Sequence, residues 1–143
     1  MFFPDKDFIE KLSDGERFIF LKVICGVVAS DKQVTREELV YLKNMAQMYQ
    51  VTGETLATMI KTANRKTLLL QARIINDRAK ALMLIKELCM VANFDTLLED
   101  NEIEYILDIA EMMNIEPSIV KDINSVVNAY ITLCNKAKNL LEL

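Results

Sequence analysis

The strongest constraint on the fold is that the chain aligns with itself. A shift of 64 residues superimposes residues 17–57 on residues 81–121 without a gap. Eight positions are identical in this alignment, whereas chance at this composition gives about two or three. They are Lys22/Lys86, Cys25/Cys89, Val27/Val91, Asp31/Asp95, Glu38/Glu102, Tyr41/Tyr105, Ala46/Ala110 and Met48/Met112. Two copies of one unit favour a compact pair of repeats that bury their apolar faces against each other.

Helices are the only elements that the pattern predicts. Apolar residues recur at intervals of three and four through both copies, which is the spacing of an amphipathic helix. Ser13 to Glu16 and Thr35 to Glu38 have the form of capping boxes, and Pro117 suits the first position of a helix. We expect helices over about 5–12, 14–30, 35–50, 52–63, 67–75, 77–93, 100–114 and 117–135, followed by a short tail helix over 136–143.

The sequence therefore predicts an all-α fold. Only 3 glycines and 2 prolines occur in 143 residues, which leaves little material for tight β-turns. We expect one domain spanning residues 1–143, built as a compact bundle of about seven to eight helices from two tandem repeats. Repeat one covers about 14–63 and repeat two about 77–135.

The cysteines and the N-terminus predict a cytoplasmic protein. Cys25, Cys89 and Cys134 are far apart in apolar runs, without a CxxC motif, so we expect buried reduced thiols. Residues 1–5 do not resemble a secretory signal. The longest uncharged apolar stretch, Val23 to Ala29, is too short to span a bilayer, so no membrane insertion is predicted.

Charge is distributed unevenly along the chain. The formal net charge of −4 gives no electrostatic footprint for nucleic acid. Residues 61–86 are rich in Lys and Arg, whereas residues 87–120 contain acids but no Lys or Arg. These segments either form solvated faces that complement one another, or give an acidic surface for a cation or a basic partner.

Two pairs of acidic residues occupy equivalent places in the repeats. Asp31 with Glu38, and Asp95 with Glu102, share one spacing. Four carboxylates without histidine or thiolate nearby favour hard cations, namely Ca²⁺, Mg²⁺ or Mn²⁺, so these residues are the candidate metal ligands. The alternative is structural, because Glu at the third helical position closes a capping box and Asp accepts hydrogen bonds from turn amides.

An enzyme is not predicted. The chain has no histidine, which removes the commonest general base and every His-containing triad. No glycine-rich phosphate loop occurs. We expect no catalytic residues and no organic cofactor.

The acidic turns resemble the signature of the TerB-like family, which is named for a bacterial tellurite-resistance protein and is related to the N-terminal domain of a DnaJ-type co-chaperone. That signature resembles Ala-x-Ala-Asp-Gly-x-Ile-x-x-x-Glu. Residues 28–38 and 92–102 both keep the Asp, the aliphatic residue and the Glu, with Lys32 and Thr96 in place of the Gly. The resemblance implies an all-helical fold, a role in stress or metal response, and divalent-cation binding by the acidic turns.

Two functional hypotheses follow. The first is a non-catalytic TerB-like module that acts through a protein partner, with a divalent cation at the acidic turns. The second is a helical adaptor or dimerisation domain, in which an acidic face over residues 99–111 meets a basic partner and no metal is bound. Both allow a homodimer, and neither involves nucleic acid.

Overall fold

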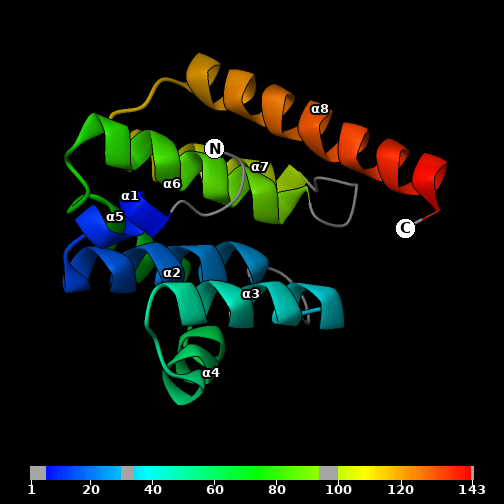
Figure 1. Ribbon diagram of the computed structural model, residues 1–143. Helices are drawn as coiled ribbons and strands as arrows, with labels where there is room; N and C mark the ends of the chain where they lie inside the picture. Colours follow the sequence, from blue (N-terminus) through cyan, green and yellow to red (C-terminus); the bar gives the residue numbers. More distant parts are fainter. Residues whose placement is uncertain (1–5, 30–33, 94–99, 143) are drawn as a thin grey trace.

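The computed structural model describes residues 6–29, 34–93 and 100–142, apart from the side chains of residues 100 and 101. Within these ranges every regular element is a helix, as the periodicity predicts. The helices are α1 (Lys6–Lys11), α2 (Asp14–Val28), α3 (Arg36–Met48), α4 (Gly53–Lys61), α5 (Arg65–Ala72), α6 (Arg78–Ala92), α7 (Asp100–Met112) and α8 (Pro117–Leu141). The described chain is therefore all-α (Figure 1).

The helix boundaries repeat with the same 64-residue shift as the sequence. Helices α2, α3 and α4 start at residues 14, 36 and 53, and α6, α7 and α8 start at residues 78, 100 and 117. Gln50 and Asn114, which follow α3 and α7, are equivalent and both have a φ of 60°. In each case the next residue donates its N–H back into the helix, from Val51 to Ala46 (2.8 Å) and from Ile115 to Ala110 (2.9 Å).

Local capping explains where the helices begin. Ser13 and Thr35 each accept a hydrogen bond from the backbone N–H three residues on, and the glutamate there returns a bond to the cap. Both predicted capping boxes are therefore confirmed. Thr52, Asn64 and Asp77 cap α4, α5 and α6 through their side chains, and Pro117 is the first residue of α8.

Helices α2 and α6 form the centre of the molecule (Figure 1). Both are buried along most of their length, and their fully buried side chains include Phe20, Leu21, Ile24, Leu84, Ile85 and Leu88. Helices α3 and α4 lie on the α2 side, whereas α8 lies along α6. Helix α5 packs against both α2 and α7. The helical hairpins of the two repeats thus bury their apolar faces in one core.

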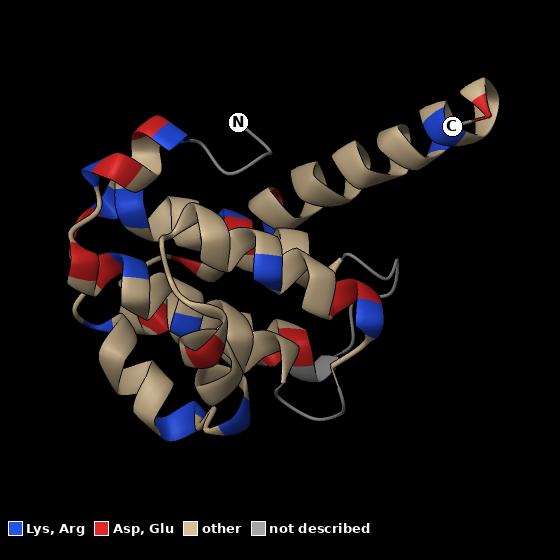
Figure 2. Cartoon of the chain, turned by 60° about the horizontal axis from the view of Figure 1, so that its bottom comes forward, with Lys and Arg blue, Asp and Glu red and all other residues tan. Residues whose placement is uncertain are grey.

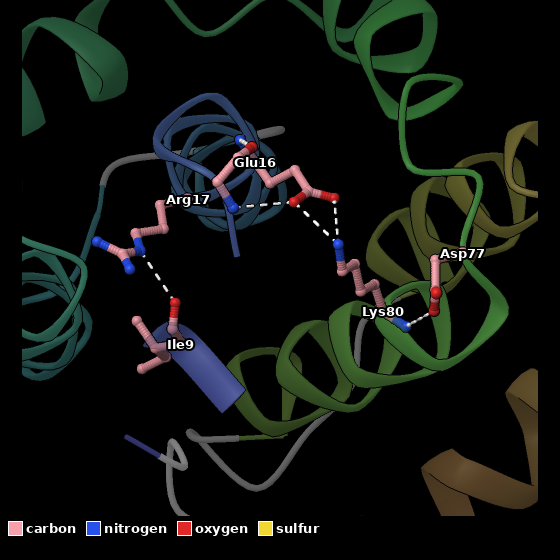
Figure 3. A network of polar contacts seen from close by, with 6 residues as sticks. Ile9, Glu16, Arg17, Asp77 and Lys80 are labelled. Carbon is pink, nitrogen blue, oxygen red and sulfur yellow. Dashed lines mark hydrogen bonds and ion pairs between the residues drawn. The ribbon is translucent and has the colours of Figure 1, made fainter. Parts of the chain in front are cut away.

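A polar network joins the two repeats at the first turns of α2 and α6 (Figure 3). The Glu16 carboxylate accepts hydrogen bonds from Ser13 N (2.9 Å) and from Lys80 Nζ (3.0 Å to each oxygen). These bonds lower the pKa of Glu16 below its ordinary value, that from the Ser13 backbone most of all. Glu16 and Lys80 occupy equivalent positions in the two repeats, 64 residues apart. Their ion pair therefore joins the matching first turns of α2 and α6.

Two details of the sequence expectations are wrong. The segment expected as two helices, 117–135 and 136–143, is one continuous helix of 25 residues, because Lys136, Ala137 and Lys138 favour a helix and no breaker intervenes. Cys25 and Cys89 are buried, which raises the pKa of each thiol to about 12. Cys134 is exposed instead, because this part of α8 extends beyond the core.

An apolar groove, the acidic turns and a buried ion pair

The ends of α2 and α6 and the starts of α3 and α7, which flank the two turns expected to bind a cation, lie at the same end of the molecule (Figure 1). Glu38 and Glu102 are both buried, each with 5% of its surface exposed. The Glu38 carboxylate accepts a hydrogen bond from Thr35 N at 2.9 Å, so it closes the capping box. Asp31 and Asp95 lie outside the described residues.

Cation binding by the acidic turns therefore stays a prediction. Within the described part of the chain, no three Asp, Glu or Cys side chains gather closely enough to hold a metal ion. Of the four candidate ligands, Glu38 and Glu102 lie in this described part of the chain. The capping box accounts for one carboxylate oxygen of Glu38.

The acidic segment after residue 87 is partly neutralised by the basic segment before it. Arg65 of α5 forms an ion pair with Asp108 of α7, and Arg78 Nη2 lies 3.0 Å from Glu116 Oε2. Glu104 and Glu111 are exposed, whereas Glu102 is buried. Asp108 and Glu116 therefore belong to helix faces of complementary charge, which is the first of the two interpretations of the charge pattern. Among the described side chains of the stretch 99–111, Glu104 and Glu111 are exposed to solvent.

Helix α6 carries a buried ion pair that the sequence analysis did not single out. Lys86 and Glu87 are 9% and 2% exposed, and the Lys86 ammonium contacts the Glu87 carboxylate. The other oxygen of Glu87 accepts a long hydrogen bond of 3.4 Å from the hydroxyl of Tyr41. Burial raises the pKa of Glu87, although the Lys86 charge opposes this.

The principal concave feature beside this ion pair is an apolar groove between α6 and α8, which we call the α6/α8 groove. Its volume is about 550 Å³. It is lined by Ala79, Leu82, Met83 and Lys86 of α6 and by Ile119, Asp122, Ile123, Val126 and Val127 of α8. Among the described residues that line it, Lys86 and Asp122 are the charged ones, and Val126 is 55% exposed. A groove with apolar walls and few charges can take the apolar face of a helix.

This groove was not predicted from the sequence, although the spacing of apolar residues in α8 carries a signal for it. Ile119, Ile123 and Val126 follow one another at intervals of four and three, and the same intervals continue to the end of α8. From the sequence, this spacing predicts only a helix over 117–135. The structure shows that Val127 is buried in the core, whereas Val126 beside it is half exposed in the groove.

The fold and the groove define a class: an all-helical module of two hairpin repeats with an apolar groove beside its last helix. The family model for tellurite resistance protein TerB matches residues 20–125. The chain therefore belongs to the TerB family, as the acidic turns suggested. Neither a search of curated proteins nor one of solved structures finds a match. Among the described residues, no helix has the length and apolar character needed to cross a membrane.

Proposed function

We propose that this TerB-family chain is a non-catalytic interaction module that binds the apolar face of a helix in the α6/α8 groove. The observation that supports this most is the groove itself. Its walls are almost wholly apolar and include Val126 and the adaptable side chain of Met83. Helix-in-groove recognition needs such a surface, with anchors at i, i+3 or i+4, and i+7.

A synthetic amphipathic peptide tests this proposal. We expect a fluorescein-labelled helix with Leu at i, i+4 and i+7 to bind the wild-type chain, measured by fluorescence anisotropy. Val126→Glu introduces a charge into the groove and is expected to weaken binding at least tenfold, which corresponds to about 1.4 kcal/mol.

Leu70→Glu is the matched control for that experiment. Leu70 of α5 is as exposed as Val126, at 55%, but does not line the groove. Its substitution is expected to leave peptide affinity unchanged. Equal losses in both variants, or no binding by the wild-type chain at a concentration at which it is monomeric, would contradict a helix-binding groove.

We further propose that the acidic turns bind a divalent cation through Asp31, Glu38, Asp95 and Glu102. Support comes from the equivalent placement of Glu38 and Glu102 as buried carboxylates next to the two turns. A stress or metal-response role and a cytoplasmic location belong to the same proposal. Both rest on the family resemblance and the composition.

Calorimetric titration with Ca²⁺, Mg²⁺ and Mn²⁺ tests the cation. We expect binding by the wild-type chain and its loss in Asp31→Asn with Asp95→Asn. The control is Asp7→Asn with Asp14→Asn, which changes charge equally but lies in α1 and at the start of α2. Absence of binding heat in the wild type, or equal affinity in both double variants, would contradict the cation site. The groove proposal would be unaffected by either result.

A further inference from the structure

The second half of α8 extends beyond the rest of the molecule (Figure 2). Residues 132–142 are all exposed, and Leu133, Leu140 and Leu141 have exposed fractions of 64%, 81% and 63%. A helix gains most of its stability in water from packing an apolar face, and three unpacked turns have only marginal stability of their own. Large apolar side chains on a projecting helix also mark an interaction surface.

Two of these leucines, Leu133 and Leu140, belong to one stripe that begins in the α6/α8 groove. At alternating intervals of four and three, this stripe contains Ile119, Ile123, Val126, Tyr130, Leu133, Ala137 and Leu140. The opposite side of the helix is polar and includes Ser125, Asn128, Thr132, Asn135 and Asn139. A stripe with this spacing is the seam along which two helices pack knobs into holes.

The two halves of the stripe complement each other in position. The first half, Ile119 to Val126, lies beside α6 and forms one wall of the groove. The second half, Leu133 to Leu140, projects with its large apolar side chains exposed. An antiparallel arrangement of two copies places the projecting half of each α8 in the groove of the other, so both halves are covered by one symmetric contact.

Charge favours this antiparallel arrangement. Asp122 and Lys136 flank the same side of the stripe, 14 residues apart. When two α8 helices run antiparallel and cross near residue 128, Leu133 of one copy faces Ile123 of the second and Lys136 faces its Asp122. A parallel pair instead places Asp122 beside the Val127 side of the second helix and leaves both charges without a complement.

We propose that the occupant of the α6/α8 groove is the projecting half of α8 from a second copy of this chain, which gives an antiparallel two-fold dimer. This inference rests on the proposed helix-binding function of the groove and names its partner. Each copy contributes both a groove and a helix, so the contact closes on itself as a dimer.

Analytical ultracentrifugation of the full chain tests the dimer. We expect the wild type to sediment as a dimer at micromolar concentration. Leu133→Asp places a charge in the seam at a side chain that is 64% exposed, and it is expected to raise the dimer dissociation constant at least a hundredfold. Thr132→Asp adds the same charge one residue away on the polar side, and it is expected to leave the dimer intact.

A charge exchange tests the orientation. Asp122→Lys and Lys136→Asp are each expected to weaken the dimer severalfold, and the double exchange is expected to restore it. In an Ala129→Cys, Cys134→Ser variant the two thiols lie close to the two-fold axis, so a short bismaleimide links them. The native Cys134 thiols lie roughly 18 Å apart along the helices and are not linked. Linkage through Cys134 rather than residue 129 would overturn the antiparallel arrangement.

The results also separate this inference from the proposal on which it rests. A wild-type chain that stays monomeric at about 100 µM overturns the dimer. If that monomer still binds the amphipathic peptide and loses it in Val126→Glu, the groove function stands and its partner is a different helix. If neither self-association nor peptide binding occurs, both are wrong. Binding of α8 to anionic lipid vesicles with no dimer would equally overturn the second copy as occupant.

Discussion

Lys86→Met is expected to lower the free energy of unfolding by about 3–5 kcal/mol at pH 8, the cost of leaving one member of a buried ion pair unpaired. Met keeps the length and apolar stem of the lysine, so little packing is lost. Among the described residues, the Glu87 carboxylate, 2% exposed, then keeps the long hydrogen bond from Tyr41. Urea unfolding followed by circular dichroism measures the loss.

The loss is expected to shrink on acidification. Burial already raises the pKa of Glu87 above its ordinary value of 4.5, and removing the Lys86 charge raises it further. A carboxyl group with a raised pKa in the folded state stabilises the fold fully below its unfolded pKa, and that contribution is lost as the pH rises through the folded pKa. The deficit of Lys86→Met relative to wild type therefore grows as the pH rises above the raised pKa that Glu87 has in the wild type, at up to about 1.4 kcal/mol per pH unit.

Two variants serve as controls for this expectation. Lys22→Met changes the repeat-equivalent lysine, which lies over the Phe18 ring at 5.6 Å and is not buried, so its effect is expected to be small and independent of pH. Lys86→Met with Glu87→Gln removes both charges and keeps an acceptor for Tyr41, so it is expected to recover most of the lost stability. A deficit of equal size at every pH would show that the ion pair is not its cause.

The fold was predictable because its signals are local and duplicated. Ser13 and Thr35 cap helices through groups three residues away, so their role is visible in the sequence. The 64-residue repeat then predicts that the second half copies the first, and the helix starts follow it. The error in α8 arose because continuation of a helix through residue 135 depends on propensity alone, without a cap or a breaker to mark its end.

The candidate sites were harder to predict because they depend on which helices meet. In sequence, Lys86 and Glu87 resemble any charged pair inside a helix. Their burial follows from the packing of α6 against neighbours distant in the chain, including Tyr41. Likewise Val126 and Val127 are adjacent and identical and both line the groove, and only the packing of α8 against its neighbours leaves Val126 55% exposed and buries Val127.

Close helix packing also explains the glycine in the middle of α2. An interior glycine costs a helix about 1 kcal/mol relative to alanine, so Gly26 needs a compensating reason. A Cβ atom at this position would lie 2.2 Å from Leu68 Cδ1 of α5 and 3.0 Å from the Tyr105 hydroxyl of α7. Gly26 therefore lets three helices approach one another at the centre of the fold.

Gly26→Val is expected to lower the free energy of unfolding by about 3 kcal/mol, because Leu68 and Tyr105 are both fully buried and must move to admit the side chain. Gly15→Val is the matched control, since a Cβ atom at Gly15 in the same helix meets only Ser13 Oγ at 4.0 Å. That variant is expected to stay within about 0.5 kcal/mol of wild type in urea unfolding.

A double variant tells whether the Leu68 contact is the cause. Leu68→Ala alone removes buried apolar volume and is expected to cost about 2–5 kcal/mol. Combined with Gly26→Val, the introduced side chain fills part of the space that Leu68 leaves, so the double variant is expected to be more stable than the sum of the single losses by about 1–3 kcal/mol. Strict additivity would mean that the introduced side chain is accommodated by a shift of α2 as a whole. The close approach of α2, α5 and α7 would then be a consequence of the fold rather than a requirement for it.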